Sequence, residues 1–226
     1  MFSYYGSKSK IVHLYPVPKY PKIIEPFAGS ARYSLRYFDH DVLLVDKYDV
    51  IVNLWKWLQK CSKQDILSLP DMYEGDSLDS FDLPLEAKSL IGFCINQGSA
   101  QPKTTAQLFN GWHRDRSTIA HSIEHVKAWN IQLGSYTDIP NQEATWFIDP
   151  PYQFGGEYYK LSNKDIDYMT LAEWCKSRKG QVIVCENTKA NWLPFRPVAQ
   201  LHGSKYNTTE AVWYNDLDQP RLFELT

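Results

Sequence analysis

The sequence has few cysteines and no long uninterrupted hydrophobic run. Its four cysteines, Cys61, Cys94, Cys175 and Cys185, form no C-x-x-C pair and no evenly spaced framework. Cys94 and Cys185 lie in apolar segments, as buried free thiols usually do, which is typical of a reducing compartment. No segment is long and apolar enough to span a bilayer, and residues 1–8 contain no apolar signal core. We therefore expect a soluble, cytoplasmic protein that does not contact a membrane.

An excess of charge of one sign is also missing. The 226 residues carry 24 Lys and Arg against 26 Asp and Glu, a formal net charge of −2. This balance excludes a polycationic nucleic-acid binder, so any basic surface must be local. Rings are abundant, with 8 Trp and 15 Tyr, and such a surplus suits a protein that handles bases. The length and the 43% of apolar residues predict one globular core with a small insertion.

One stretch combines a buried strand with a rigid polar end. The run Ala144–Ile148 is rich in strand formers and stops at Asp149-Pro150-Pro151-Tyr152. Neither proline can donate to a strand ladder, so the result is a stiff loop at the carboxyl end of a strand, where open α/β sheets bind ligands. These groups suit a planar ring with an amino group: Asp149 and the Pro150 carbonyl accept from the amine, and Tyr152 stacks on the ring. The alternative is a proline-braced turn with a buried tyrosine.

The first part of the chain has the pattern of a nucleotide-binding unit. Residues 22–30 indicate a short strand and a glycine turn, with Ser30 as the N-cap of a helix over residues 31–38. A second strand, Val42–Val45, ends in Asp46, and a helix with apolar residues at helical spacing follows. Strand, turn, helix, strand and terminal acid make one βαβ unit.

The glycine turn of this unit indicates which cofactor it suits. It contains one glycine and no G-x-G-x-x-G, so the pyrophosphate-binding fingerprint is absent. Gly29 still lets the backbone approach a ligand closely, and Asp46 follows 17 residues later, close to the spacing at which a carboxylate meets ribose hydroxyls. These features suit a nucleoside cofactor without phosphates, such as S-adenosylmethionine. The alternative is an ordinary strand–turn–helix junction.

The strand pattern stops between Ser62 and Asn130, which indicates an insertion. A helix is expected from about Asp82, and a polar stretch from Asn96 to Arg116 contains Asp115 as its only acid. Gln, Asn, Lys and Arg beside aromatic rings are the side chains that read base edges and bind phosphates. We expect nucleic-acid contacts from this local basic surface, through Lys103, Trp112, His113, Arg114 and Arg116. The alternative is a solvated loop.

A second motif in the insertion resembles a metal site. Ser117 is the expected cap of a helix in which His121 and His125 belong to an H-x-x-E-H pattern found in some metalloproteases. Both histidines fall on the polar face of that helix, and no further cluster supplies a partner ligand. We interpret the motif as a solvated helix face and expect no metal.

The remaining elements complete an α/β fold. Residues 153–159 predict a glycine-hinged aromatic loop that can close over a ligand. The other elements expected are strands at 131–136 and 181–187, a helix at about 165–179, and an antiparallel pair at 198–202 and 210–214.

With the N-terminal arm, the Pro26-Phe27-Ala28-Gly29-Ser30 turn, Asp46 and the D-P-P-Y motif in this order, the chain resembles the Dam-like DNA adenine-N6 methyltransferases. The resemblance implies a Rossmann-like methyltransferase sheet, mostly parallel with a C-terminal antiparallel hairpin, plus a small, mainly helical insertion. It implies a catalytic domain of residues 1–61 and 131–226. The inserted target-recognition region is then residues 62–130.

The resemblance also assigns roles to individual residues. The implied cofactor-binding residues are Tyr4, Lys8, Glu25, Phe27, Gly29, Asp46, Tyr136 and Asp149. The implied catalytic residues are Asp149, Pro150, Pro151 and Tyr152. Two positions depart from the family: Tyr4 stands where a Trp is usual, and Ser135 stands where an acid is common. The insertion is short and has no obvious recognition hairpin, so the family's familiar target sequence is not transferred.

The activity that follows is methyl transfer from S-adenosylmethionine to the N6 amino group of an adenine flipped out of double-stranded DNA. Such site-specific DNA modification is known from restriction–modification systems, and the resemblance implies a bacterial or phage-encoded enzyme, for which we favour a monomer. No metal is needed, because the leaving group is a neutral thioether. The alternatives are RNA adenine, cytosine N4 or a protein glutamine amide as acceptor, or a catalytically silent methyltransferase fold that binds nucleic acid. Asp149 favours adenine as the acceptor, because the corresponding motif in related enzymes for other amines often begins with Ser or Asn instead of Asp.

Overall fold

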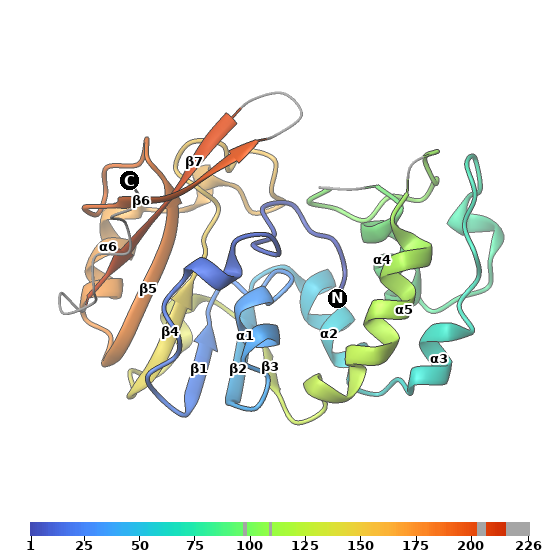
Figure 1. Ribbon diagram of the computed structural model, residues 1–226, viewed down its shortest axis with the longest axis horizontal. Coiled ribbons are helices and arrows are strands. Elements are labelled where there is room, and N and C mark those ends of the chain that lie inside the picture. The colour runs from blue at the N-terminus through green and yellow to red at the C-terminus, as the bar shows by residue number, and fades with distance from the viewer. Residues whose placement is uncertain (97–98, 109, 203–206, 216–226) are drawn as a thin grey trace.

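The computed structural model describes residues 1–96, 99–108, 110–202 and 207–215, and its centre is a seven-stranded sheet (Figure 1). In chain order the strands are β1 (Lys22–Glu25), β2 (Asp41–Asp46), β3 (Asn130–Leu133), β4 (Ala144–Ile148), β5 (Gly180–Asn187), β6 (Arg196–His202) and β7 (Asn207–Tyr214). Their order across the sheet is β3-β2-β1-β4-β5-β7-β6. The end of the predicted catalytic domain, residues 216–226, lies outside the described residues.

Five of these strands pair in parallel, and the other two form an antiparallel hairpin at one edge of the sheet. β3, β2, β1, β4 and β5 pair in parallel, and β7 pairs antiparallel with both β5 and β6. The predicted fold class is confirmed as an architecture: the sheet is Rossmann-like and mostly parallel, with a C-terminal antiparallel hairpin and a small, mainly helical insertion. β1 lies in the middle, with β2 and β3 on one side and β4 on the other. The direction in which successive strands are added to the sheet therefore reverses between β1 and β4. Such a switch point is where open α/β sheets bind ligands.

Alternating side chains of the strands fill two cores, one on each face of the sheet. Ile23 belongs to one hydrophobic cluster and Ile24 to the other, and the same alternation separates Phe147 from Trp146. All four are buried, which explains why apolar residues follow one another directly in β1 and in β4. The helix α6 (Tyr168–Lys176) packs on the face of Ile24, and α1 (Arg32–Arg36) and α2 (Asp49–Leu58) pack on the face of Ile23.

Two helices start later than the sequence predicts. Ala31, with a φ of 45°, precedes α1, which is shorter than the predicted range 31–38. Ser30 is not its N-cap, because the Ser30 hydroxyl donates to Ser7 Oγ (3.2 Å) and so links the turn to the N-terminal arm, residues 1–10. In α6, the Asp167 carboxylate accepts from the N–H groups of Met169 and Thr170, which fixes the start at Tyr168 and not near 165.

The insertion is mainly helical, as expected. It holds α3 (Lys63–Leu67), α4 (Leu85–Cys94) and α5 (Trp112–Ser122), with 3-10 turns η2 (Leu78–Ser80) and η3 (Ile123–Val126). Elsewhere the 3-10 turns are η1 (Val12–Leu14), η4 (Tyr136–Asp138) and η5 (Asn163–Asp165). Ser117 lies inside α5 and is not its cap: the Trp112 N–H donates to Asn110 Oδ1 (3.2 Å), and the helix starts at Trp112, six residues earlier than a cap at Ser117 predicts.

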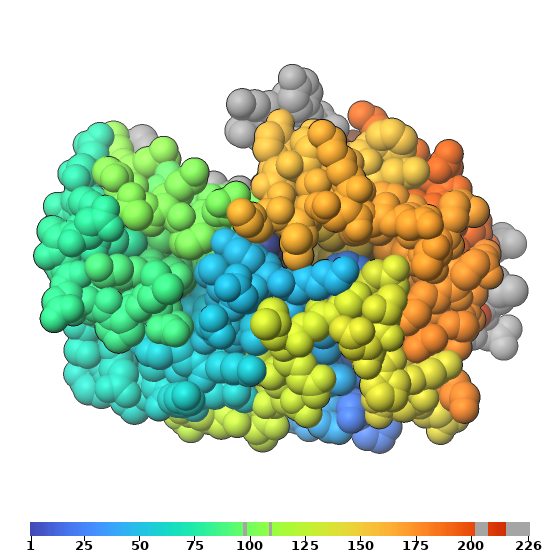
Figure 2. All heavy atoms as spheres, turned by 180° about the vertical axis from the view of Figure 1, so that it is seen from behind, coloured from blue at the N-terminus to red at the C-terminus, as the bar shows by residue number. Residues whose placement is uncertain are grey.

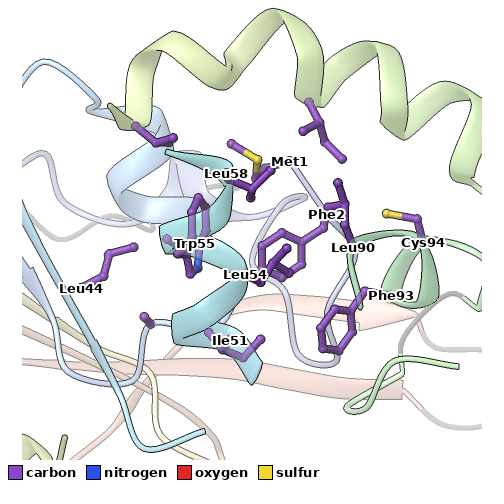
Figure 3. Close-up of a cluster of buried hydrophobic side chains, with 14 of the residues drawn as sticks. Met1, Phe2, Leu44, Ile51, Leu54, Trp55, Leu58, Leu90, Phe93 and Cys94 are labelled. Carbon is purple, nitrogen blue, oxygen red and sulfur yellow. The ribbon is translucent and has the colours of Figure 1, made fainter. Parts of the chain in front are cut away.

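The insertion shares its hydrophobic core with the sheet. Phe2 of the N-terminal arm is 0% exposed, and its ring lies 5.3 Å from that of Trp55 in α2 and 5.6 Å from that of Phe93 in α4. Figure 3 shows Phe2 between these helices, with Leu54 and Leu90 beside it. In Figure 1, α3, α4 and α5 accordingly stand beyond α2 on one flank of the sheet. The division into a catalytic domain and a target-recognition region stays a prediction. In the described part of the chain, no helix is long and apolar enough to cross a membrane.

Candidate active site

A cavity of about 410 Å³ opens at the carboxyl ends of β1, β2 and β4, on both sides of the switch point. Its walls come from five places: the N-terminal arm, the turn after β1, the residues after β2, the loop after β3 and the loop after β4. Figure 2 shows this face, where residues after β2 (blue to cyan), around η4 (yellow) and before α6 (orange) meet. All eight residues with a predicted cofactor-binding role line the cavity. Their role stays a prediction.

The turn after β1 is held by the carboxylate at the end of β2. Gly29 has a φ of 43°, in the left-handed region that favours glycine, and its N–H donates to Asp46 Oδ2 (3.0 Å). Asp46 Oδ1 accepts from the Tyr48 N–H (2.8 Å). A Cβ on Gly29 would lie 3.1 Å from the Tyr4 ring, so a side chain there would also require that ring to shift by a few tenths of an ångström. Burial raises the pKa of Asp46, and the backbone donors oppose that rise.

Two rings form the wall of the cavity between β1 and β3. The centroids of Phe27, in the turn after β1, and Tyr136, at the start of η4, lie 5.6 Å apart with an angle of 31° between the rings. Ser135, where the family commonly has an acid, caps η4 together with Asp138, whose Oδ2 accepts from the Ser135 N–H (2.8 Å). Asp138 therefore supplies an acid three residues after Ser135, but its carboxylate is hydrogen-bonded to the backbone.

Glu25, the last residue of β1, is a buried carboxylate in the cavity wall. Its Oε1 accepts from the Ser34 N–H (2.7 Å) near the start of α1. Burial raises the pKa of Glu25 to about 8, although the bond from Ser34 opposes the shift. Burial thus favours the protonated form of Glu25, and a cation that enters the cavity beside it would favour the carboxylate.

The Asp149 carboxylate forms an ion pair with a lysine of the N-terminal arm. Lys8 is 5% exposed, and its Nζ lies 2.9 Å from Asp149 Oδ1 and donates to the Gly6 carbonyl (2.9 Å). Burial raises the pKa of Asp149 to about 6, and the Lys8 ammonium limits the rise. Burial alone would lower the pKa of Lys8, but Asp149 and Glu210 outweigh that effect and leave it above its ordinary value. Lys8 is therefore an ammonium ion.

Tyr152 is oriented by a second carboxylate, which the sequence analysis does not single out. Glu210 in β7 is 2% exposed, and its Oε1 accepts from the hydroxyls of Tyr152 (2.5 Å) and Tyr15 (2.6 Å). The same oxygen lies 3.9 Å from Lys8 Nζ. Lys8 Nζ in turn lies 4.6 Å from the centroid of the Tyr152 ring, so the ammonium faces the ring. No local motif marks Glu210, because its partners are 58 and 195 residues away in the chain.

The loop that holds the D-P-P-Y motif is fixed from two sides. Glu186 Oε1, in β5, accepts from the Gln153 N–H (2.6 Å), and the Tyr168 hydroxyl donates to the Pro151 carbonyl (2.5 Å). Burial raises the pKa of Glu186 to about 7, against the hydrogen bonds that it accepts. Gly156 has no room for a side chain, because a Cβ there would collide with the Tyr152 carbonyl. The prolines and these bonds together hold Asp149 and Tyr152 in place.

Of the four predicted catalytic residues, Asp149 and Pro151 line the cavity, whereas Pro150 is buried behind it and Tyr152 lies beyond Lys8. Aromatic residues of the loop after β4 cover the arm, as the sequence predicts for a closing loop. The Tyr159 hydroxyl donates to the Tyr5 carbonyl (3.1 Å), and the two rings are 5.2 Å apart. This contact closes one side of the cavity.

The predicted nucleic-acid-binding residues do not form one free basic surface. Trp112 is 0% exposed and its Nε1 donates to the Pro70 carbonyl (2.8 Å), so this ring belongs to the core and is not available to stack on a base. Arg116 and His113 pair with Asp71 at 2.6 Å and 3.2 Å, and Arg114 pairs with Asp115 at 3.1 Å. These residues and Lys103, which is exposed, keep their assignment only as a prediction. Gln97, Gly98 and Phe109, in the same stretch, lie outside the described residues.

The H-x-x-E-H motif does not form a metal site. His121 Nδ1 lies 2.7 Å from the Ser117 carbonyl and its Nε2 lies 3.0 Å from Lys63 Nζ, while the His125 ring stacks on Phe38 with centroids 3.7 Å apart. Within the described ranges, no group of three or more His, Cys, Asp or Glu side chains could hold a metal ion. All four cysteines are buried and free.

Comparison with known proteins gives similarity of structure only. No family model matches the sequence, and no curated protein does. Among solved structures, the chain is similar to a proposed methylase from Haemophilus influenzae, with 13% identity, a TM-score of 0.36, and coverage of 86% of this chain and 78% of the other. It is also similar to a proposed methyltransferase from Escherichia coli, with 10% identity, a TM-score of 0.34, and coverage of 84% and 74%.

Proposed function

We propose that this protein is an S-adenosylmethionine-dependent methyltransferase that acts on the N6 amino group of adenine in DNA. One observation supports this most strongly. The Asp149 carboxylate lines the same cavity as Gly29 and Asp46, which come from the ends of three neighbouring strands at the switch point. A nucleoside-binding turn and an amine acceptor thus share one enclosed space, which is what a transfer between two bound molecules requires.

The residues of the cavity fit S-adenosylmethionine. A volume of 410 Å³ lies in the range of roughly 300–1,000 Å³ that is common for small-molecule sites. The cofactor, when bound, supplies an electrophilic methyl group on a sulfonium ion. Asp46 would hold its ribose, Phe27 and Tyr136 would contact its adenine, and the cationic methionine end would lie near Glu25 and the Gly29 turn. A cation beside Glu25 would lower the pKa of this acid and keep it ionised.

Asp149 and Pro150 would bind the target amine. An exocyclic amino group is a weak nucleophile, because its lone pair is delocalised into the ring. When the Asp149 carboxylate and the Pro150 carbonyl accept its two N–H bonds, the lone pair turns toward the methyl group and the charge that develops on nitrogen is stabilised. Tyr152 would stack on the flipped base, which offsets part of the few kcal/mol that extrusion costs.

In this proposal, the insertion supplies contacts to the phosphates of the DNA. Lys103, His113 and Arg114 are exposed, but His113 and Arg114 are paired with acids. Binding of double-stranded DNA therefore requires that phosphates compete with Asp71 for His113 and with Asp115 for the Arg114 guanidinium. No metal enters this proposal.

The test is mass spectrometry of nucleosides after duplex DNA and RNA are incubated with the protein and the cofactor. We expect N6-methyladenine in DNA, formed by the wild type and by the control Asp79→Asn, whose side chain is exposed and remote from the cavity. Asp149→Ala is expected to form none. N6-methyladenine in RNA or N4-methylcytosine would move the activity to another acceptor, and the absence of any methylated product would reject the proposal.

A further inference from the structure

Lys8 occupies the position in which the proposed mechanism needs the target amine. Its Nζ lies 2.9 Å from Asp149 Oδ1, the distance of a strong charged hydrogen bond, and 4.6 Å from the centroid of the Tyr152 ring. A flipped adenine would use the same acceptor and the same ring face. A base and the Lys8 ammonium cannot both be there. In this conformation, the target position next to the cofactor cavity is therefore filled by a side chain of the protein itself.

The backbone of Lys8 is fixed, so only its side chain can move. The Lys8 carbonyl accepts from the N–H groups of Ile11 (3.0 Å) and Val12 (2.8 Å). Its neighbour Ser7 accepts from Arg32 Nε (3.0 Å), which ties the arm to the start of α1. The lysine stem is flexible, and its ammonium has three donors that can be redirected.

A second buried carboxylate is within reach of the same ammonium. Glu210 Oε1 lies 3.9 Å from Lys8 Nζ, so a shift of about 1 Å brings the pair to hydrogen-bond distance. A carboxylate has about four acceptor sites, so Glu210 can hold Lys8 and still accept from Tyr15 and Tyr152. A buried charge that loses its partner is costly, and this transfer avoids that cost for Lys8.

We propose that Lys8 fills the target-amine position when no base is bound, and that Glu210 takes over its ammonium as the base enters. This inference rests on the proposed function, because it names the residues that open and close that same site. Glu210 is then a positioning residue with two tasks: it binds Lys8 away from Asp149 and it holds the Tyr152 hydroxyl. Lys8 is not itself a methyl acceptor, since an ammonium ion has no lone pair.

The test compares two nucleosides, adenosine and purine riboside, which lacks the exocyclic amine. Dissociation constants are measured on protein saturated with S-adenosylhomocysteine, so that neither nucleoside binds in the cofactor's place. The quantity of interest is the amine preference, the dissociation constant of purine riboside divided by that of adenosine. A purely structural role of Glu210 through Tyr152 changes both constants alike and leaves this ratio unchanged.

We expect Lys8→Met to raise the amine preference about fivefold, because Asp149 is then free for the amine. Glu210→Gln keeps an acceptor for the tyrosine hydroxyls but loses the charge that receives Lys8, so it is expected to lower the preference. The double variant is expected to match Lys8→Met, since Glu210 has no ammonium to receive when Lys8 is absent. Binding of S-adenosylhomocysteine and thermal unfolding check each variant for intact structure.

The inference is overturned if Glu210→Gln leaves the amine preference at the wild-type value, a result that stands even if Lys8→Met does not fold. It is also overturned if the double variant falls below Lys8→Met, or if adenosine shows no binding to any of the proteins. Because no methyl transfer is measured, these outcomes are separate from those of the proposed function. If the variants show the expected amine preferences but no methylated product is formed, the Lys8–Glu210 exchange is supported and the proposed methyltransferase activity is rejected.

Discussion

Three buried carboxylates make the stability of the folded protein depend on pH. Glu25, Asp149 and Glu186 are held in or behind the cavity wall, and burial raises the pKa of each, to about 8, 6 and 7. In the unfolded chain these acids lose their protons at lower pH. The folded state therefore binds more protons between about pH 4.5 and 8, and its stability falls as the pH rises through that window.

Glu25→Gln tests this relation. Gln still accepts from the Ser34 N–H but carries no proton to lose, so the variant is expected to lose less stability than the wild type between pH 5 and pH 8. Urea unfolding at the two pH values gives the difference. Parallel losses in the two proteins would mean that Glu25 titrates normally in the folded state.

Asp46 links the glycine turn to the proposed cofactor. Asp46→Ala removes the acceptor for the Gly29 and Tyr48 N–H groups and for a ribose, so we expect cofactor affinity to fall by about 1–3 kcal/mol. Asp41, at the opposite end of the same strand, is exposed and pairs with Lys22, which makes Asp41→Ala a matched control. Equal affinities of the two variants in a calorimetric titration would remove Asp46 from the site.

At the scale of elements, the strands were more predictable than the helix ends. Short apolar runs, such as the one before Asp149, are local signals, and the buried residues of β1, β2, β4 and β5 follow them. Helix starts depend on partners elsewhere in the chain. Ser30 and Ser117 have the chemistry of caps, but Ser30 bonds to the arm, and α5 begins at Trp112, whose N–H donates to Asn110. Competing hydrogen bonds of this kind leave no trace in the local pattern.

The two arginines of α5, Arg114 and Arg116, differ in exposure, so we expect their substitutions to have different effects. Arg116 donates to the Leu69 carbonyl and pairs with Asp71, so Arg116→Ala is expected to lower thermal stability. Lys103→Gln with Arg114→Gln is expected to weaken DNA binding and to lower the salt slope by about 1.8, with cofactor affinity unchanged.

The control for that double variant is Lys176→Gln on α6, outside the insertion. DNA binding of the double variant is measured across a salt series. An unchanged salt slope would show that neither Lys103 nor Arg114 contacts phosphate.

At the scale of the whole molecule, one core joins the arm, the sheet and the insertion. The βαβ unit and the acids at the ends of its second strand and of the D-P-P-Y strand were predictable from local motifs, and the family resemblance implied the mostly parallel sheet. The sequence did not predict that Trp112 is a core residue, or that Glu210 joins the D-P-P-Y loop to β7. Both depend on contacts between distant segments, and a polar or aromatic residue has the same appearance in a sequence whether it is buried or exposed.

Phe2→Ala probes this shared core. Phe2 lies between Trp55 and Phe93, so its truncation leaves a cavity and is expected to lower the free energy of unfolding by about 3–5 kcal/mol. Cofactor affinity should fall as well, because Tyr4 and Lys8 are on the same arm. Val17→Ala, at a position 65% exposed, is the control. A stability equal to that of the control would mean that the arm does not hold the insertion to the sheet.

The measurement that tests the central claim most directly is the single-turnover rate of methyl transfer to DNA by Asp149→Asn. Asn keeps the size of the side chain and one carbonyl oxygen, but it loses the charge that stabilises the amine during transfer. We expect the rate to fall by about 10²–10³ with cofactor affinity within a few-fold of wild type. A variant that binds the cofactor normally and transfers the methyl group at the wild-type rate would contradict the claim that Asp149 holds the target amine.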